Sequence, residues 1–361
     1  MPAGRPPAPD TARPVQPVPR GMSMPSDRGA RASRTATRAA LAALLTTAVV
    51  AGLALWWATA AAQERPQLAG RLLIPRGPDL WSMLAAGGGE QVLASAPAGS
   101  LILDVAAEPG RRQLVFSRLL LPTRDELGGA DLYLLPLQGG EPTLLLAHDA
   151  PGALLTTPAW APGGDSVLFT YTPYSLGAAG AEAQPRIERV QLDSHNRTVL
   201  LEQALAPALS PDGRLLAYLR RTPQGDALWV AESGAGPGRE LIPPTRFLGL
   251  AYPRVAPDGA SVAVAATVDL PALPAPGPAP RPAARAAHGL PWDVWLVSID
   301  GRELRRLTYL LEDDPSLAWS PDGRWLAIQG GYGLTLVEVS TAHTERLTRQ
   351  AAFGAIDWIR E

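Results

Sequence analysis

The chain has 361 residues, of which 46% are hydrophobic and 18% charged, so it can bury at least one large core. It contains no cysteine, which excludes disulfides, thiolate metal sites and cysteine nucleophiles. All 32 basic side chains are arginine, which excludes mechanisms that need a lysine. The net charge of -2 leaves no basic surface that would predict a nucleic-acid partner.

The N-terminal part differs in composition from the rest. Residues 1–38 carry seven arginines against Asp10 and Asp27 and lack apolar periodicity, so we expect them to be disordered. Residues 39–62 form an uncharged stretch of about 24 residues, long enough to cross a bilayer as a helix. Arginines flank only its N-terminal side. The positive-inside rule therefore predicts a single-pass protein of the cell membrane with residues 63–361 outside the cytoplasm.

A cleaved signal peptide is the alternative to a membrane anchor. Ala60-Ala61-Ala62 supplies the small residues of a cleavage site before Gln63. Cleavage there would give a secreted or periplasmic protein.

The remaining sequence, 63–361, contains a repeated turn motif. Two weaker copies contain Pro109 and Pro162, and prolines of successive copies are 46 to 64 residues apart. Proline presets the second position of a type I turn and glycine suits the fourth, so we expect a structural role for these residues in joining antiparallel strands. The three full copies are Ser210-Pro211-Asp212-Gly213, Ala256-Pro257-Asp258-Gly259 and Ser320-Pro321-Asp322-Gly323.

A second hairpin follows each turn. In one repeat the segment beginning at Asp131 leads into Gly139-Gly140, and in another the segment beginning at Asp293 leads into Asp300-Gly301; both dipeptides lie between apolar runs and indicate hairpins. Each unit is therefore four short antiparallel strands, which is typical of a β-propeller blade. Because an aspartate recurs at the same place in several units, we predict that it makes structural hydrogen bonds; these residues are Asp79, Asp131, Asp226 and Asp293.

The number of units predicts a ring of six blades. The two ends of this region are incomplete: 70–95 lacks a first strand, and 355–359 resembles a first strand without its successors. Together they make one blade, and sharing it would close the ring and remove open sheet edges. A disordered C-terminal tail is the rival interpretation. The five complete units cover roughly 103–147, 157–202, 206–242, 252–308 and 316–348.

The best copy of the repeat, Trp319 to Ala327 (WSPDGRWLA), resembles the Trp-Ser-Pro-Asp-Gly signature of TolB-like six-bladed propellers. The resemblance covers about 63–361. It implies an all-β six-bladed propeller of four-stranded antiparallel blades, preceded here by the N-terminal helix. The motif is specific for the fold and indicates almost nothing about function.

Sequence motifs typical of enzymes, cofactor sites or metal sites are scarce. No nucleophile elbow, Walker A, zinc-binding H-E-x-x-H or EF-hand pattern occurs, so we expect no cofactor and no metal. The four histidines fall in different repeats without ligand spacing.

Topology predicts where binding would occur. If the strands of a blade are A to D, the B–C and D–A connections share one face, and every long insertion is a B–C loop: 120–130, 173–184 and 271–291. Variable loops on a rigid scaffold commonly carry function. The candidate binding residues on this face are His148, Asp149, Tyr252, Glu312, Asp313, Asp314 and Phe353.

Two functions remain open. The favoured hypothesis is a non-enzymatic, monomeric propeller that binds a protein or peptide partner on the B–C and D–A loops at the cell envelope. The alternative is a hydrolase or lyase in the funnel that uses His148 with Asp149 and the acidic residues of 312–314. Propellers host both kinds of function. The 271–287 segment has six prolines, which predicts a mobile loop outside the core.

Overall fold

The structure is a computed structural model that describes residues 68–360 except 111, 178–179, 233–234 and 268–289. The predicted segments 1–38 and 39–62 and the proline-rich segment 271–287 lie outside the described residues. Every regular element of the described part is a β-strand. It has no helix with the length and apolar character to cross a membrane.

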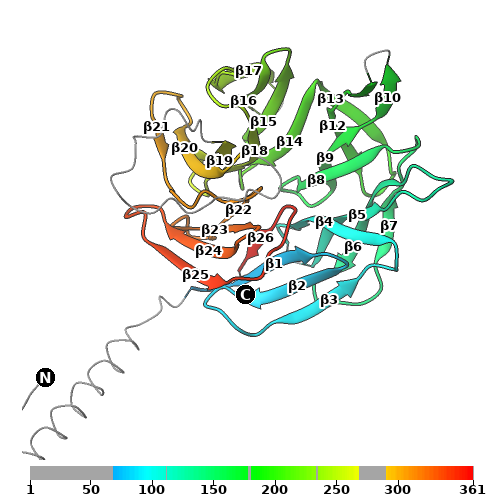
Figure 1. Cartoon of the computed structure of the whole chain (residues 1–361), viewed down its shortest axis with the longest axis horizontal. Coiled ribbons are helices and arrows are strands. Elements are labelled where there is room, and N and C mark those ends of the chain that lie inside the picture. The colour runs from blue at the N-terminus through cyan, green and yellow to red at the C-terminus, as the bar shows by residue number, and fades with distance from the viewer. Residues whose placement is uncertain (1–67, 111, 178–179, 233–234, 268–289, 361) are drawn as a thin grey trace, which may run out of the picture. The chain divides into compact units, whose positions relative to one another are not determined.

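The strands form blades around a common centre (Figure 1). Four sheets are separate four-stranded blades, and one eight-stranded sheet is two blades joined by a single parallel bridge, Ala130 to Leu154, so the blades number six. We number them from the N-terminus.

The strand bounds follow the chain order. Blade 1 is β1 (Arg71–Arg76), β2 (Asp79–Leu84) and β3 (Gln91–Ser95) with β26 (Asp357–Ile359). Blade 2 is β4 (Ser100–Ala107), β5 (Gln113–Leu120), β6 (Gly129–Pro136) and β7 (Thr143–Leu146). Blade 3 is β8 (Leu154–Trp160), β9 (Ser166–Thr172), β12 (Arg186–Gln191) and β13 (Arg197–Glu202), with the hairpin β10 (Tyr174–Gly177) and β11 (Gly180–Ala183) between its second and third strands.

The second half of the ring is more regular. Blade 4 is β14 (Ala204–Leu209), β15 (Leu215–Thr222), β16 (Gly225–Glu232) and β17 (Ala235–Ile242). Blade 5 is β18 (Leu250–Val255), β19 (Ser261–Thr267), β20 (Trp292–Ser298) and β21 (Leu304–Arg306). Blade 6 is β22 (Ser316–Trp319), β23 (Trp325–Gly330), β24 (Gly333–Glu338) and β25 (Thr344–Thr348).

Blade 1 closes the ring with strands from both ends of the chain. Its order is β26-β1-β2-β3, and Trp358 of β26 pairs with Leu72 of β1. The terminal segment is therefore the missing first strand and not a disordered tail. The described sheets match the predicted six units.

The core consists of six apolar clusters, each between two neighbouring blades. Side chains alternate along a strand, so one strand supplies two clusters. In β1, Leu72 and Ile74 pack toward blade 6, whereas Leu73 packs toward blade 2. First-strand tryptophans add hydrogen bonds between blades: the indole of Trp160 donates to Ala106 O at 3.0 Å.

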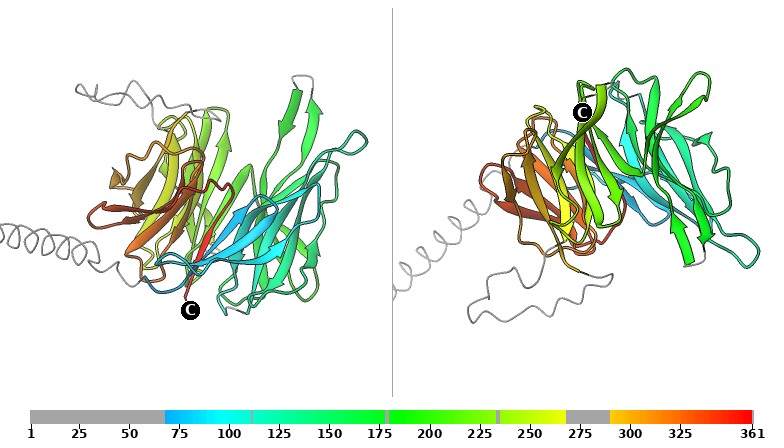
Figure 2. Two further views of the ribbon diagram at one scale, coloured as in Figure 1. Left: turned by 60° about the horizontal axis from the view of Figure 1, so that its bottom comes forward. Right: turned by 90° about the horizontal axis from the view of Figure 1, so that it is seen from above.

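Two details differ from the sequence-based expectation. The insertion 173–184 was predicted as a long loop, but it contains the hairpin β10–β11, which projects from the ring on the side away from the C-terminus (Figure 2). Tyr252 was assigned to a D–A connection but lies inside the first strand of blade 5, β18. The pairing of β18 shifts register between Ala251 and Arg254, and Tyr252 takes φ 47° in this bulge. A bulge adds a residue that strand periodicity does not reveal.

Candidate functional site

The ring has two faces with different connections. The loop face carries the B–C and D–A connections, and the turn face carries the A–B and C–D turns. On the loop face the described connections include 121–128, 147–153, 243–249, 307–315 and 349–356. The A–B turns of the turn face are 108–112, 161–165, 210–214, 256–260 and 320–324.

The repeated motif forms the A–B turns through its own side chains. Asp212 Oδ1 lies 2.6 Å from Ser210 Oγ and accepts a hydrogen bond from Arg214 N at 3.0 Å. Gly213 N donates to Ser210 O at 2.8 Å, which closes the turn. The hydrogen bonds from Ser210 and Arg214 hold the pKa of Asp212 below its ordinary value. The motif thus stabilises an exposed turn.

The recurrent blade aspartates hold the loop-face ends of neighbouring strands together. Asp79 accepts from Ser95 Oγ at 2.5 Å, and Asp226 binds Arg221 at 3.0 Å. Asp293 accepts from Thr308 Oγ1 at 2.9 Å and also bonds Arg306. Each of these contacts lies within one blade.

His148 and Asp149 are neighbours in sequence but bind different groups. His148 Nδ1 lies 2.6 Å from Asp131 Oδ1, and this oxygen also accepts from His148 N. Asp149 accepts from Tyr171 Oη at 2.5 Å and from Arg197 at 2.8 Å. The hydrogen bond from Tyr171 and the charge of Arg197 lower the pKa of Asp149, while burial and Asp149 raise the pKa of Tyr171 to about 12. Both candidates are therefore held in structural networks.

Tyr252 and Asp314 interact electrostatically. Burial raises the pKa of Tyr252 well above its ordinary value, and the negative charges of Asp104 and Asp314 add to the effect. The structure therefore brings two of the candidates into one electrostatic environment, together with Asp104, which the sequence did not indicate.

The other acidic candidates pack against blade 6. Glu312 is only 1% exposed, and its Oε1 accepts from Tyr332 N at 2.7 Å and Asp313 N at 3.2 Å. Burial raises its pKa. Asp313 is also buried, whereas Phe353 is 39% exposed at the connection into β26. In the described residues, no group of three or more histidine and acidic side chains is arranged to hold a metal ion.

Large apolar side chains are exposed mainly on the loop face. Of eleven such residues in the described part, seven lie there and the other four lie on outer strands. The three most exposed are Leu248, Tyr309 and Leu127, at 75%, 74% and 69%. The seven are Leu121, Leu127, Leu248, Leu290, Tyr309, Tyr332 and Phe353.

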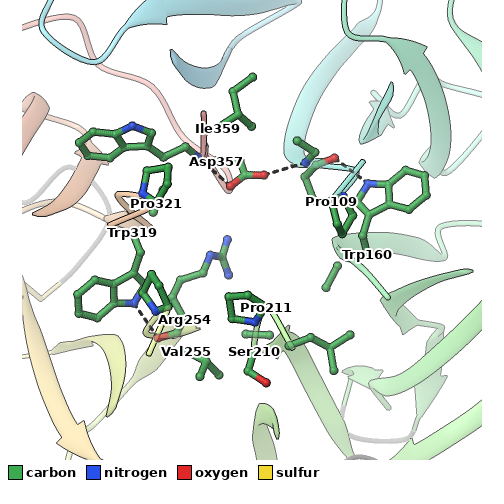
Figure 3. A pocket seen from close by; sticks show the side chains of 18 of the residues that line it. Pro109, Trp160, Ser210, Pro211, Arg254, Val255, Trp319, Pro321, Asp357 and Ile359 are labelled. Carbon is green, nitrogen blue, oxygen red and sulfur yellow. Dashed lines mark hydrogen bonds between the residues drawn. The ribbon is translucent and has the colours of Figure 1, made fainter. Parts of the chain in front are cut away.

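On the turn face, the channel opens as a pocket of about 580 Å³ (Figure 3). Prolines of five A–B turns form its rim, with Trp160 and Trp319 in the wall. Arg254 extends into its centre, and Asp357 lies across the opening from it (Figure 3). The rim consists of Pro109, Pro162, Pro211, Pro257 and Pro321.

Carboxylates inside the channel connect the first strands of different blades. Asp104 accepts from Ala355 N at 2.7 Å and from Thr157 N at 2.8 Å, so one side chain links blades 1, 2 and 3. Asp357 accepts from Ala107 N at 2.8 Å. Burial raises the pKa of both carboxyls, although these hydrogen bonds oppose it.

Asp104, Arg254 and Asp357 were not among the site residues predicted from the sequence. A signal was present for two of them. When the repeats are aligned, the residue just before the tryptophan of the first strand is Ala159, Ala318 or Asp357. Arg254 occupies the same position in blade 5. Charged residues at a position otherwise held by alanine mark a departure from the structural repeat.

The sequence matches no family model and no curated protein. Among solved structures, the chain resembles TolB from Acinetobacter baumannii with a TM-score of 0.59 at 18% identity, over 81% of this chain and 67% of that one. It resembles a chain of the nidogen/laminin complex with a TM-score of 0.55 at 12% identity, over 80% of this chain and 97% of that one. At such identities the likeness concerns the fold. The described part of this chain therefore has the fold of a TolB-like six-bladed β-propeller.

Proposed function

We propose that this protein is a non-enzymatic propeller that works outside the cytoplasm and binds a protein partner through its loop face. The observation that carries the proposal is the concentration of exposed apolar side chains on that face. Apolar surface exposed preferentially on one face of a protein commonly marks a surface that contacts something else. Aromatic residues are also enriched in protein interfaces, and Tyr309, Tyr332 and Phe353 are among the seven.

The loop face offers a rigid frame for such contacts. Leu127 stands on the B–C connection of blade 2, and its side chain is 3.7 Å from the position that a Cβ on Gly152 would take. Leu248 and Tyr309 stand on the D–A connections before and after blade 5. Their backbones are held at both ends by strands of the ring. Little conformational entropy is therefore lost when a partner binds.

Site-specific photo-crosslinking in cells tests the partner proposal. A photoreactive residue at Leu248 or Tyr309 should give discrete adducts with a partner protein. The matched control is Val199, which is 49% exposed on the outer strand β13 and off the loop face. Adducts of equal yield at all three positions, or none at Leu248 and Tyr309, would contradict the proposal.

The proposed location rests on the one-sided arginines and the uncharged stretch 39–62. Protease added to spheroplasts should digest the propeller, and full protection would exclude a site outside the cytoplasm. An intact N-terminal segment in the mature protein supports a membrane anchor. A mature N-terminus at Gln63 instead supports a cleaved signal.

The rival proposal, a hydrolase or lyase, has one geometric feature in its favour. The 2.6 Å contact between His148 Nδ1 and Asp131 would orient the imidazole as a general base. Among the other proposed acids, the Glu312 carboxylate instead accepts hydrogen bonds from the backbone N–H groups of Tyr332 and Asp313. Loss of a measurable activity in His148→Ala with the fold retained would favour this rival.

A further inference from the structure

The turn face carries a second site, formed by one position repeated in all six first strands. In each blade, the residue at this position pairs with the corresponding residue of the second strand. For example, Ala159 pairs with Leu168, Arg254 with Ala263, and Asp357 with Leu73. Four of the six are alanines, so their short side chains leave the channel open. The set is Ala106, Ala159, Ala208, Arg254, Ala318 and Asp357, and all of them line the pocket.

Arg254 has donors that the protein does not use. Its one hydrogen bond in the described part runs from Nη1 to Pro253 O, at 3.0 Å. No carboxylate of the described residues lies within ion-pair distance of its guanidinium. The side chain is partly open to the channel, and Figure 3 shows it directed into the pocket rather than against a wall. A guanidinium has five N–H groups, so most of them face solvent or a ligand.

The nearby carboxylates are already engaged with backbone groups. Asp357 accepts from Ala107 N and from Trp358 N, both at 2.8 Å. Asp104 accepts from Thr157 N and Ala355 N. These contacts connect blades 1, 2 and 3, on the opposite side of the ring from β18. The hydrogen bonds of the two carboxylates do not involve Arg254. Burial lowers the pKa of Arg254 and the negative charges of Asp357 and Asp104 oppose this, but neither carboxylate forms an ion pair with it in the described part of the chain.

The pocket around Arg254 has the size and lining of a ligand site. Its volume of about 580 Å³ falls in the range of about 300–1,000 Å³ that is typical of such sites. Leu209, Val255 and Ile359 make parts of its wall apolar, next to Trp160 and Trp319. The proline rim fixes its shape. A ligand would need an acceptor group for Arg254 and an apolar part for the wall.

We propose that Arg254 binds a carboxylate of a peptide that enters the channel from the turn face. The planar guanidinium fork matches a carboxylate with two parallel hydrogen bonds. Asp357, across the opening, repels a ligand of purely anionic character but accommodates one that also carries N–H donors, as the end of a peptide does. The carboxylate is either the C-terminal group or an acidic side chain. This site lies on the face opposite the proposed partner surface and does not depend on it.

Binding of short N-acetylated peptides to the full-length protein tests the proposal. The probes are a mixture of apolar tetrapeptides with a free C-terminus, the same peptides amidated, and amidated peptides that contain one glutamate. Fluorescence of the pocket tryptophans and thermal stabilisation report binding. We expect the free or the glutamate-containing set to bind and the amidated apolar set to bind at least about tenfold more weakly. Preference for one carboxylate set identifies the source of the carboxylate. Equal binding of all three sets, or binding of none, overturns the proposal.

Variants assign the binding to Arg254. Arg254→Gln should weaken carboxylate binding about tenfold or more. Arg214→Gln, at an arginine with 86% of its side chain exposed on the same face, is the matched control and should bind as the wild type does. If Arg254→Gln does not fold, Ala159→Leu, which fills the pocket and leaves Arg254 in place, should abolish binding. Undiminished binding by folded Arg254→Gln, or by Ala159→Leu, overturns the assignment.

Discussion

Trp358→Ala tests whether the last strand holds the ring together. Trp358 is 5% exposed and packs in the cluster between blades 1 and 6 with Leu72, Ile74 and Trp325. Truncating a buried tryptophan to alanine costs about 3–5 kcal/mol because of lost contacts and the remaining cavity. Against a total stability of about 5–15 kcal/mol, this is a large fraction. The melting temperature should fall on the order of 10 °C.

Two further variants separate packing from hydrogen bonding and local context. Trp358→Phe keeps most of the ring but loses the indole bond to Ala69 O, at 3.1 Å. Because Ala69 is exposed, water can replace that donor, and the cost should be only about 1 kcal/mol. Phe353→Ala, at a 39% exposed residue of the same terminal segment, should change stability by less than about 0.5 kcal/mol.

Thermal unfolding followed by circular dichroism and by calorimetry measures all three variants. The order of destabilisation should be Trp358→Ala, then Trp358→Phe, then Phe353→Ala. A melting temperature of Trp358→Ala within about 2 °C of the wild type would refute the argument that β26 contributes to closure.

Three other predictions follow from local geometry. Gly354 has φ +101°, and a Cβ there would lie 1.4 Å from a backbone carbonyl oxygen of blade 2, so Gly354→Ala should reduce thermal stability severely. The control is Gly77→Ala, at φ +64° with nothing within 4 Å, which should cost only about 1 kcal/mol of stability. Although partial burial acts to raise the pKa of Asp322, its hydrogen bonds from Ser320 and Arg324 hold the pKa below 3.8. It therefore stabilises the fold above that pH, and the stability difference between wild type and Asp322→Asn should vanish as the pH falls through the lowered pKa; a pH-independent difference would contradict this. Ultraviolet titration should find Tyr171 ionising near pH 12, and Asp149→Asn should lower that pKa toward 10; an unchanged titration curve would show that Asp149 has no such effect.

The repeated turn motif allowed the architecture to be predicted from the sequence. Each Pro-Asp-Gly turn marked a pair of strands, and the half-repeats at both ends, including Trp358, predicted that β26 would pair with β1. These signals are local, since a turn needs particular residues at fixed positions whatever surrounds it. Tyr252 was misplaced because a β-bulge changes the strand register without a sequence signature of its own.

The chemistry of the channel depended on distances that the sequence does not contain. Asp104 and Ala355 are 251 residues apart and share a hydrogen bond of 2.7 Å. The loop-face candidates were chosen because their connections share one side of the ring. Sharing a side does not bring side chains together, however. His148 pairs with Asp131, Asp149 with Tyr171 and Arg197, and Glu312 with the backbone of blade 6.

Closure by β26 also imposes an order on synthesis. The inner edge of β1 is among the first parts of the propeller to leave the ribosome, whereas its partner, Asp357–Ile359, is among the last. Until then β1 exposes unpaired backbone groups that can associate with any other strand. A chain that lacks β26 retains this open edge permanently. The pairing of β26 with β1 therefore distinguishes a closed ring from an open one that quality-control proteases and chaperones would engage.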